Sequence, residues 1–110
     1  MNADIKIIAP SGRLDITNVA KFRLDISGAV ALKPKAILID LKDVTFMDSS
    51  GLGALVSALK TARSSQCDLY ICSLSEQVQM LFNLTSMSKI FKIYPDRESC
   101  LQDLGVSQAK

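Results

Sequence analysis

The stretch Val44-Thr45-Phe46-Met47-Asp48-Ser49-Ser50-Gly51-Leu52-Gly53 connects two segments whose patterns decide the fold. The apolar run 36–41, Ala-Ile-Leu-Ile-Asp-Leu, precedes it and is typical of a buried strand. The segment that follows has apolar residues at helical spacing: Leu52, Leu55, Val56 and Leu59. The two serines therefore lie where a helix begins, and there backbone N–H groups lack partners and the helix dipole is positive. A hydroxyl at this position can cap the helix, and an accessible one can also accept a phosphate.

Strand-like and helix-like segments alternate along the chain. The expected strands cover 5–9, 13–15, 36–41, 68–73 and 90–94. The expected helices run from a cap at Thr17 to Gly28, from about Ser50 to Arg63, onward from a cap at Ser75, and from Pro95-Asp96 to Leu104-Gly105. This alternation predicts an α/β fold, with a mostly parallel sheet of four to five strands and about four helices. The first two strands could add an antiparallel edge, which would make the sheet mixed.

Composition and charge exclude several classes of protein. The 110 residues are 48% apolar and 22% charged, close to the average of soluble globular domains, and the formal net charge is +2. Lys and Arg are scattered with little aromatic interleaving, so we expect no direct binding of nucleic acid. No apolar run approaches the roughly 18 residues of a membrane span, and the N-terminus does not resemble a signal peptide. We expect one cytoplasmic domain over 1–110, with loose termini at 1–3 and 106–110.

The chain contains no histidine, which removes the commonest general base and the commonest metal ligand. Ser49 therefore cannot belong to a Ser-His-Asp triad supplied by this chain. The segment Gly51-Leu52-Gly53 is not a phosphate-binding loop, because the lysine and the other glycines of that motif are absent. The three cysteines lack metal-binding spacing, and Cys72 lies in an apolar segment where we expect it to be buried. We expect no enzymatic activity, no metal and no cofactor.

Three segments together resemble the motifs of one known family. They are Gly12-Arg13-Leu14-Asp15, the strand 37–41, and the turn from Phe46 to Gly53. They resemble the early Gly-x-Leu-Asp, the central strand and the phosphorylation motif of the STAS domain, specifically of its stand-alone anti-sigma factor antagonists. Leu81-Phe82 and the segment 91–94 also fit, so the resemblance spans nearly the whole chain. One departure is the loop 64–67, where the family often has glycine; we expect it to affect the shape of the turn and not the function.

The resemblance implies roles for individual residues. In the family the serine directly after the aspartate accepts the phosphate, which is Ser49 here; Ser50 remains an alternative site, and from its position alone Ser49 could be only a helix cap. Asp48 is either a solvated acid of the turn or a contact to the partner or its nucleotide–metal site. Leu52 also fits the core pattern of the helix. The residues expected to contact a partner are Asp15, Met47, Asp48, Ser50, Gly51, Leu52 and Gly53.

The function that the resemblance implies is a binding module switched by serine phosphorylation. When unphosphorylated, it would sequester an anti-sigma factor that is also a serine kinase of the GHKL type. A PP2C-type serine phosphatase would reset it. The alternative is a STAS protein that regulates a different partner-switch kinase, or a STAS subunit of a transport complex, neither of which acts on a sigma factor.

Overall fold

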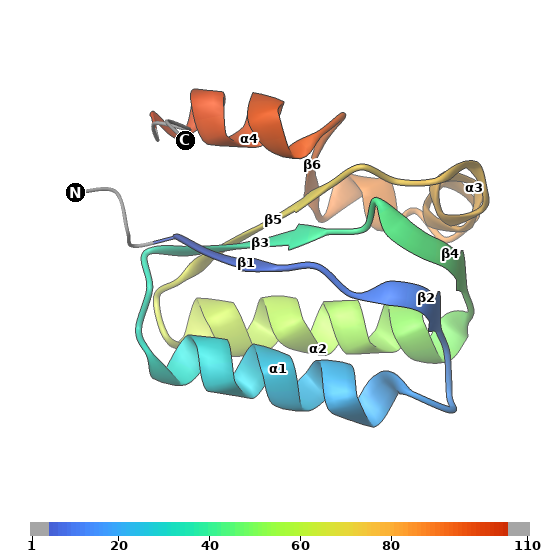
Figure 1. Cartoon of the computed structure of the whole chain (residues 1–110), viewed down its shortest axis with the longest axis horizontal. Coiled ribbons are helices and arrows are strands. Elements are labelled where there is room, and N and C mark those ends of the chain that lie inside the picture. The colour runs from blue at the N-terminus through green and yellow to red at the C-terminus, as the bar shows by residue number, and fades with distance from the viewer. Residues whose placement is uncertain (1–4, 106–110) are drawn as a thin grey trace.

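Four parallel strands form the central sheet of the computed structural model, which describes residues 5–105. They are β1 (Ile5–Ile8), β3 (Ala36–Asp40), β5 (Asp68–Cys72) and β6 (Lys92–Tyr94), in the spatial order β1-β3-β5-β6. A second sheet pairs β2 (Ser11–Leu14) with β4 (Asp43–Met47), again in parallel. Figure 1 shows that β2 and β4 extend beyond the ends of β1 and β3, at the right of the view.

The helices divide between the two faces of the central sheet (Figure 1). Helices α1 (Val19–Ala31) and α2 (Ser49–Ser64) lie side by side on one face, and α4 (Arg97–Asp103) lies on the other. Helix α3 (Glu76–Leu84) lies beside β4 and leads to a short 3-10 helix, η1 (Met87–Lys89). The start of α2 and the ends of β2 and β4 therefore meet at one end of the molecule, next to α3.

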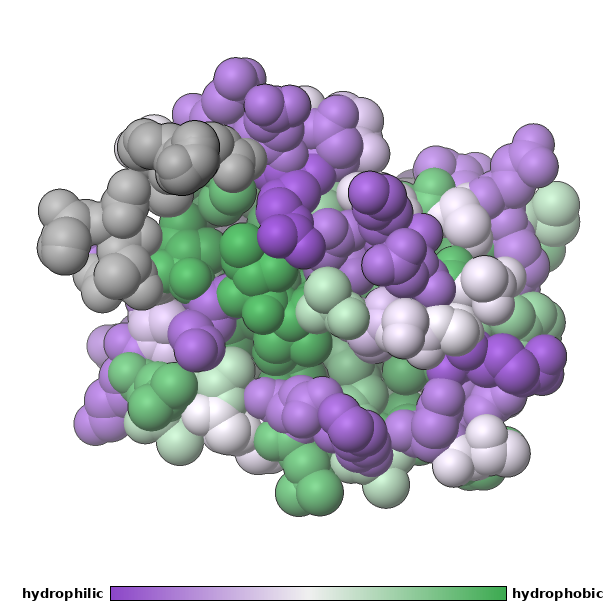
Figure 2. All heavy atoms as spheres, viewed as in Figure 1, coloured by the Kyte–Doolittle hydropathy of each residue, from purple (hydrophilic) through white to green (hydrophobic). Residues whose placement is uncertain are grey.

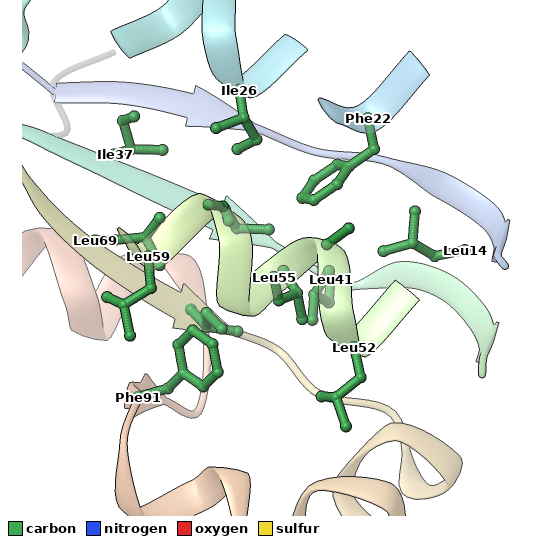
Figure 3. Close-up of a cluster of buried hydrophobic side chains, with 14 of the residues drawn as sticks. Leu14, Phe22, Ile26, Ile37, Leu41, Leu52, Leu55, Leu59, Leu69 and Phe91 are labelled. Carbon is green, nitrogen blue, oxygen red and sulfur yellow. The ribbon is translucent and has the colours of Figure 1, made fainter. Parts of the chain in front are cut away.

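The main core lies between the central sheet and helices α1 and α2. Strand β3 is buried along its whole length, which explains the apolar run over 36–39; Asp40, at its end, is buried as well. Figure 3 shows Phe22 and Ile26 of α1 pointing toward Leu55 of α2 and Ile37 of β3. A smaller cluster lies beneath α4 and contains Leu38, Cys72, Cys100 and Leu101. Each large side chain buried in this way stabilises the fold by about 1.5–3 kcal/mol.

Strand β1 forms an edge of the central sheet. Figure 2, seen from the same side as Figure 1, shows apolar surface along this strand above the two helices. Ile7 of β1 is 39% exposed. This surface lies away from the end of the molecule where β4 meets α2.

The predicted α/β class, with a mostly parallel sheet and four helices, is confirmed. The suggested antiparallel edge is wrong. Strand β1 pairs with β3 and β2 with β4, both in parallel, because the chain continues from β1 into β2 in the same direction instead of reversing (Figure 1). Strand β4 was not among the expected strands, and Cys72 is buried as predicted.

The prediction that Thr17 caps the first helix is wrong. Helix α1 begins at Val19 after Asn18, whose side chain makes no capping bond, and the Thr17 hydroxyl bonds to Asp15 instead. The helix also passes Gly28, which lies on its exposed face, and ends at Ala31. The expected loose termini at 1–3 and 106–110 fall outside the described residues. Within residues 5–105, no helix is both long enough and apolar enough to cross a membrane.

Candidate functional site

The turn from β4 into α2 is organised by the carboxylate of Asp48. This residue is the N-cap of the helix, and its Oδ1 atom accepts hydrogen bonds from the backbone N–H of Ser50 (2.8 Å) and of Gly51 (3.1 Å). Two of the N–H groups that a helix start leaves without partners are thereby satisfied. The interpretation of Ser49 or Ser50 as the cap is therefore wrong, because an aspartate one position earlier reaches these groups first.

Ser49 is the first residue of α2 and is exposed. Its hydroxyl makes no hydrogen bond to any residue of the described part of the chain. Ser50 is half-buried by comparison. Ser49 is thus the more accessible of the two serines, and it stands where the helix dipole favours negative charge.

The residues expected to contact a partner differ widely in exposure. Gly53 is exposed, and Asp48 and Ser50 are half-buried. The other four are buried within the domain: Asp15, Met47, Gly51 and Leu52. Met47 is 1% exposed and Leu52 7%, so both side chains belong to the core of the isolated chain. Phe46, on the opposite side of β4 from Met47, is half-exposed instead.

Asp15 organises the loop that follows β2. Its carboxylate accepts hydrogen bonds from the Thr17 hydroxyl (2.5 Å) and N–H (3.0 Å), and from Nε of Arg13 (2.8 Å). The Thr17 hydroxyl first, and then the Arg13 guanidinium, hold the pKa of Asp15 below its usual value. Asn18 completes the loop by accepting from the Asp15 N–H at 3.0 Å and donating to the Arg13 carbonyl. Asp15 is therefore a charged, fully bonded residue at the rim of the site.

Pairing of β2 with β4 places this loop beside the Ser49 turn. Leu14 is the register partner of Met47, and the Asp48 N–H lies 3.5 Å from the Leu14 carbonyl oxygen. On the exposed side of the pair, the Arg13 guanidinium stacks over the Phe46 ring at 4.6 Å from its centroid. Such a contact contributes about 0.5–1 kcal/mol at an exposed position. The early Gly-x-Leu-Asp segment and the serine turn thus form one continuous surface.

Gly51 allows this close packing. A Cβ atom at this position would overlap the Leu14 carbonyl oxygen and would lie 2.8 Å from Cγ of Met47. At Gly53, two residues later in the same helix, a Cβ would meet nothing within 4 Å. The first glycine is therefore required by the approach of the β2 end to the helix, whereas the second leaves the surface open next to Ser49.

Gln77 also belongs to this site, although it was not among the residues expected from the sequence. Its side-chain amide forms two hydrogen bonds with the backbone of Met47: Oε1 accepts from the N–H at 2.9 Å, and Nε2 donates to the carbonyl at 3.0 Å. The bonds join residues 30 positions apart, so no local sequence pattern predicts them. Gln77 thereby fixes the last residue of β4 from the direction of α3.

The arrangement offers an acceptor group without catalytic groups around it. Ser49 presents a free hydroxyl, and the carboxylate of the preceding residue, Asp48, is occupied by the helix cap. Within residues 5–105, no group of three or more acidic or cysteine side chains is placed to hold a metal ion. A residue of this kind can receive a phosphoryl group from an enzyme that docks on it, and the resulting charge would lie at the positive end of a helix.

Comparison with known proteins extends over nearly the whole chain. The family model described as STAS domain matches residues 2–100. An anti-sigma F factor antagonist of Paenibacillus polymyxa is 28% identical over 103 residues, which cover 93% of this chain and 88% of that protein. An anti-sigma-B factor antagonist of Listeria monocytogenes is 32% identical over 83 residues, covering 76% of this chain and 73% of that protein. A Thermotoga maritima structure assigned as an anti-sigma factor antagonist has a TM-score of 0.86 at 28% identity, covering 94% of this chain and 89% of its own.

Proposed function

This chain belongs to the STAS domain family, and from that premise we propose that it is an anti-sigma factor antagonist switched by phosphorylation of Ser49. The relatives named as anti-sigma factor antagonists support the class of partner. The observation that carries the site assignment is the exposed hydroxyl of Ser49, left free because Asp48 caps the helix in its place. In this proposal the chain is a cytoplasmic binding module and not an enzyme.

The unphosphorylated chain would bind an anti-sigma factor that is also a serine kinase of the GHKL type. The docking surface would surround Ser49 and include Asp48, Ser50 and Gly53. The buried residues Asp15, Met47, Gly51 and Leu52 would contribute by holding that surface in shape. Binding of the anti-sigma factor to this surface would release its sigma factor.

The partner would then transfer the γ-phosphoryl group of its ATP to this chain. In that step a bond forms between Oγ of Ser49 and the γ-phosphorus, and the bond from phosphorus to the leaving ADP breaks. The hydroxyl proton passes to a base of the partner, since this chain has no histidine and its Asp48 is committed to the cap. A PP2C-type phosphatase would hydrolyse the phosphoserine and restore the first state.

The phosphate would weaken docking through its charge. It adds about −1.5 to −2 charges at neutral pH, directly beside the carboxylate of Asp48. The helix start offsets part of this charge within the domain, but the partner surface would have to approach an anion that was not there before. A hundredfold loss of affinity needs only about 2.7 kcal/mol, which is within the range of one such change.

Phosphorylation by purified kinases tests the proposal. The chain is incubated with Mg-ATP and each GHKL-type serine kinase of its source organism, and the modified residue is mapped by mass spectrometry. We expect phosphate on Ser49 of the wild type and none on Ser49→Ala. Phosphate on Ser50 with Ser49 unmodified would make the site assignment wrong. Absence of phosphate with every such kinase would refute the switch and favour a STAS subunit that works without it.

A further inference from the structure

We propose that Gln77 is a positioning residue for phosphoryl transfer to Ser49. The inference rests on the proposed function for the identity of the reaction, and on the contacts between α3 and β4 for the role of the residue. Gln77 does not touch the reacting atoms. It acts through the backbone of Met47, which lies two residues before the acceptor serine.

The backbone of Met47 faces away from β2. In a parallel pair, successive residues direct their backbone groups to opposite sides of the strand. The Asp48 N–H points to Leu14 of β2, so the N–H and carbonyl of Met47 point toward α3. No strand lies on that side of β4 within the described residues, because this sheet contains only β2 and β4.

The amide of Gln77 makes the two hydrogen bonds to Met47 that a neighbouring strand would otherwise make. It offers one acceptor and one donor, as a peptide group does, and it uses both on Met47 at 2.9 and 3.0 Å. Gln77 itself is held in place, because Ser75 caps α3 through Val78, and Val78 and Phe82 are fully buried in the main core. The pair of bonds therefore ties the end of β4 to a rigid element.

This tie bears on the transfer step more than on docking. Ser49 follows Met47 after a single residue, so freedom at Met47 becomes freedom in the direction of the Ser49 hydroxyl. Phosphoryl transfer needs the attacking oxygen close to the phosphorus and in line with the leaving group, and misplacement by about 1 Å can cost 100-fold in rate. Of the proposed docking groups, Ser50 and Gly53 lie further along α2 than Ser49, so freedom at Met47 displaces them less.

The fold does not depend on the tie. The side chain of Met47 is buried in the core, and β4 remains paired with β2. Gln77 is only half-buried, so water can reach the Met47 backbone when the amide is removed. Gln77→Met keeps the length of the side chain and removes both hydrogen bonds. Gln79→Met is the matched control, because Gln79 is exposed on the same helix and its side chain bonds to nothing in residues 5–105.

Two measurements on the wild-type chain and these two variants test the inference. The first is steady-state phosphorylation by the kinase that modifies Ser49. We expect kcat to fall about 10- to 100-fold in Gln77→Met, with KM changed less than about threefold, and Gln79→Met to match the wild type. The second is amide hydrogen exchange, in which Met47 should exchange at least about tenfold faster in Gln77→Met while the amides of β3 keep their protection.

The possible outcomes separate this inference from the proposed function. An unchanged kcat in Gln77→Met would overturn it, and so would a change confined to KM, which would make Gln77 a docking residue. Faster exchange throughout β3 would mean that the bonds serve overall stability, and would also overturn it. If no kinase phosphorylates the wild-type chain, the proposed function fails. The exchange of Met47 then decides by itself whether Gln77 holds the turn.

Discussion

The carbonyl oxygen of Leu14 occupies the space that a side chain on Gly51 would need. Leu14 ends β2 and Gly51 lies in the first turn of α2, so this contact sets the separation between the Asp15 loop and the Ser49 turn. Leu14 and Gly51 are 37 positions apart in the sequence (51 − 14), yet the segments that contain them form one surface. A glycine is the only residue that lets the backbone approach so closely.

Alanine substitutions at the two glycines of α2 should therefore have opposite effects. Gly53→Ala should raise the free energy of unfolding by about 0.5–1 kcal/mol, because alanine favours the helix and meets no neighbour there. Gly51→Ala should lower it by about 1–3 kcal/mol, because the added methyl group displaces Leu14 or Met47. Urea denaturation of the two variants measures both changes. Equal stabilisation by the two alanines would contradict the close contact.

Substitution of Asp48 should separate its role as the helix cap from a contact with the kinase. Asp48→Ala loses both capping bonds and should lower the free energy of unfolding by about 1 kcal/mol. Asp48→Asn keeps a side-chain oxygen in the same place and should remain close to the wild type. Thermal unfolding checks this order, which would be wrong if the alanine variant were as stable as the asparagine variant. Slower phosphorylation of a fully stable Asp48→Asn would then identify a contact with the kinase.

A negative charge at position 49 should weaken binding and leave stability almost unchanged. Ser49→Asp should weaken binding to the anti-sigma factor kinase, because it places a charge on the docking surface, and Ser49→Ala should preserve binding. Both variants keep the cap, which belongs to Asp48. Calorimetric titration with the purified kinase measures the affinities, and thermal unfolding serves as the control. Equal affinities of the two variants would exclude a switch that works through charge.

The pairing of Asp40 with Arg97 should make stability fall in acid. Burial alone would raise the pKa of Asp40, but the Lys42 N–H and the Arg97 guanidinium, each at 3.0 Å, outweigh it and hold the pKa below the usual value. A carboxyl group of this kind stabilises the fold above its unfolded pKa of about 3.9 and loses that contribution as the pH falls through its folded pKa.

Asp40→Asn should therefore be less stable than the wild type at pH 7, and the difference should narrow below about pH 4. The acid sensitivity should not vanish, because the pKa values of Asp15 and Asp96 are also lowered by hydrogen bonds. Urea denaturation at pH 7, 5 and 3 measures the difference. Asp43→Asn, at an exposed position of β4, serves as the control. A difference that is constant with pH would show that the ionised form of Asp40 contributes nothing.

The sequence predicted the features that rest on local patterns. The buried strand β3 follows from its apolar run, and α2 follows from the spacing of Leu52, Leu55 and Leu59. The expectation that Ser49 and not Ser50 accepts the phosphate came from the family motif, because no local rule separates the two serines.

Of the features that were missed, the helix cap is local and the others depend on contacts distant in sequence. Asp48 caps α2 through bonds to the N–H groups of Ser50 and Gly51. Strand β4 was missed because it is a strand through its pairing with β2, far earlier in the chain. The hydrogen bonds from Gln77 to Met47 join two different elements, so no periodicity of the sequence predicts them. The conformation of the loop 64–67 could not be predicted from its residue types either. Gln66 adopts a φ of 59°, a left-handed conformation that glycine favours, although the residue is not a glycine.

The parallel pairing of every strand in residues 5–105 also governs how the molecule forms during synthesis. A parallel pair cannot close as a hairpin, so β1 has no partner until residues 36–39 have been made. The serine turn lacks the support of α3 until Gln77 has followed. Chains that depend on such distant pairings fold more slowly than helical bundles, whose contacts are local. Ser49 is therefore synthesised well before the serine turn reaches its folded conformation. A partner that recognises the folded turn would not bind an incomplete nascent chain.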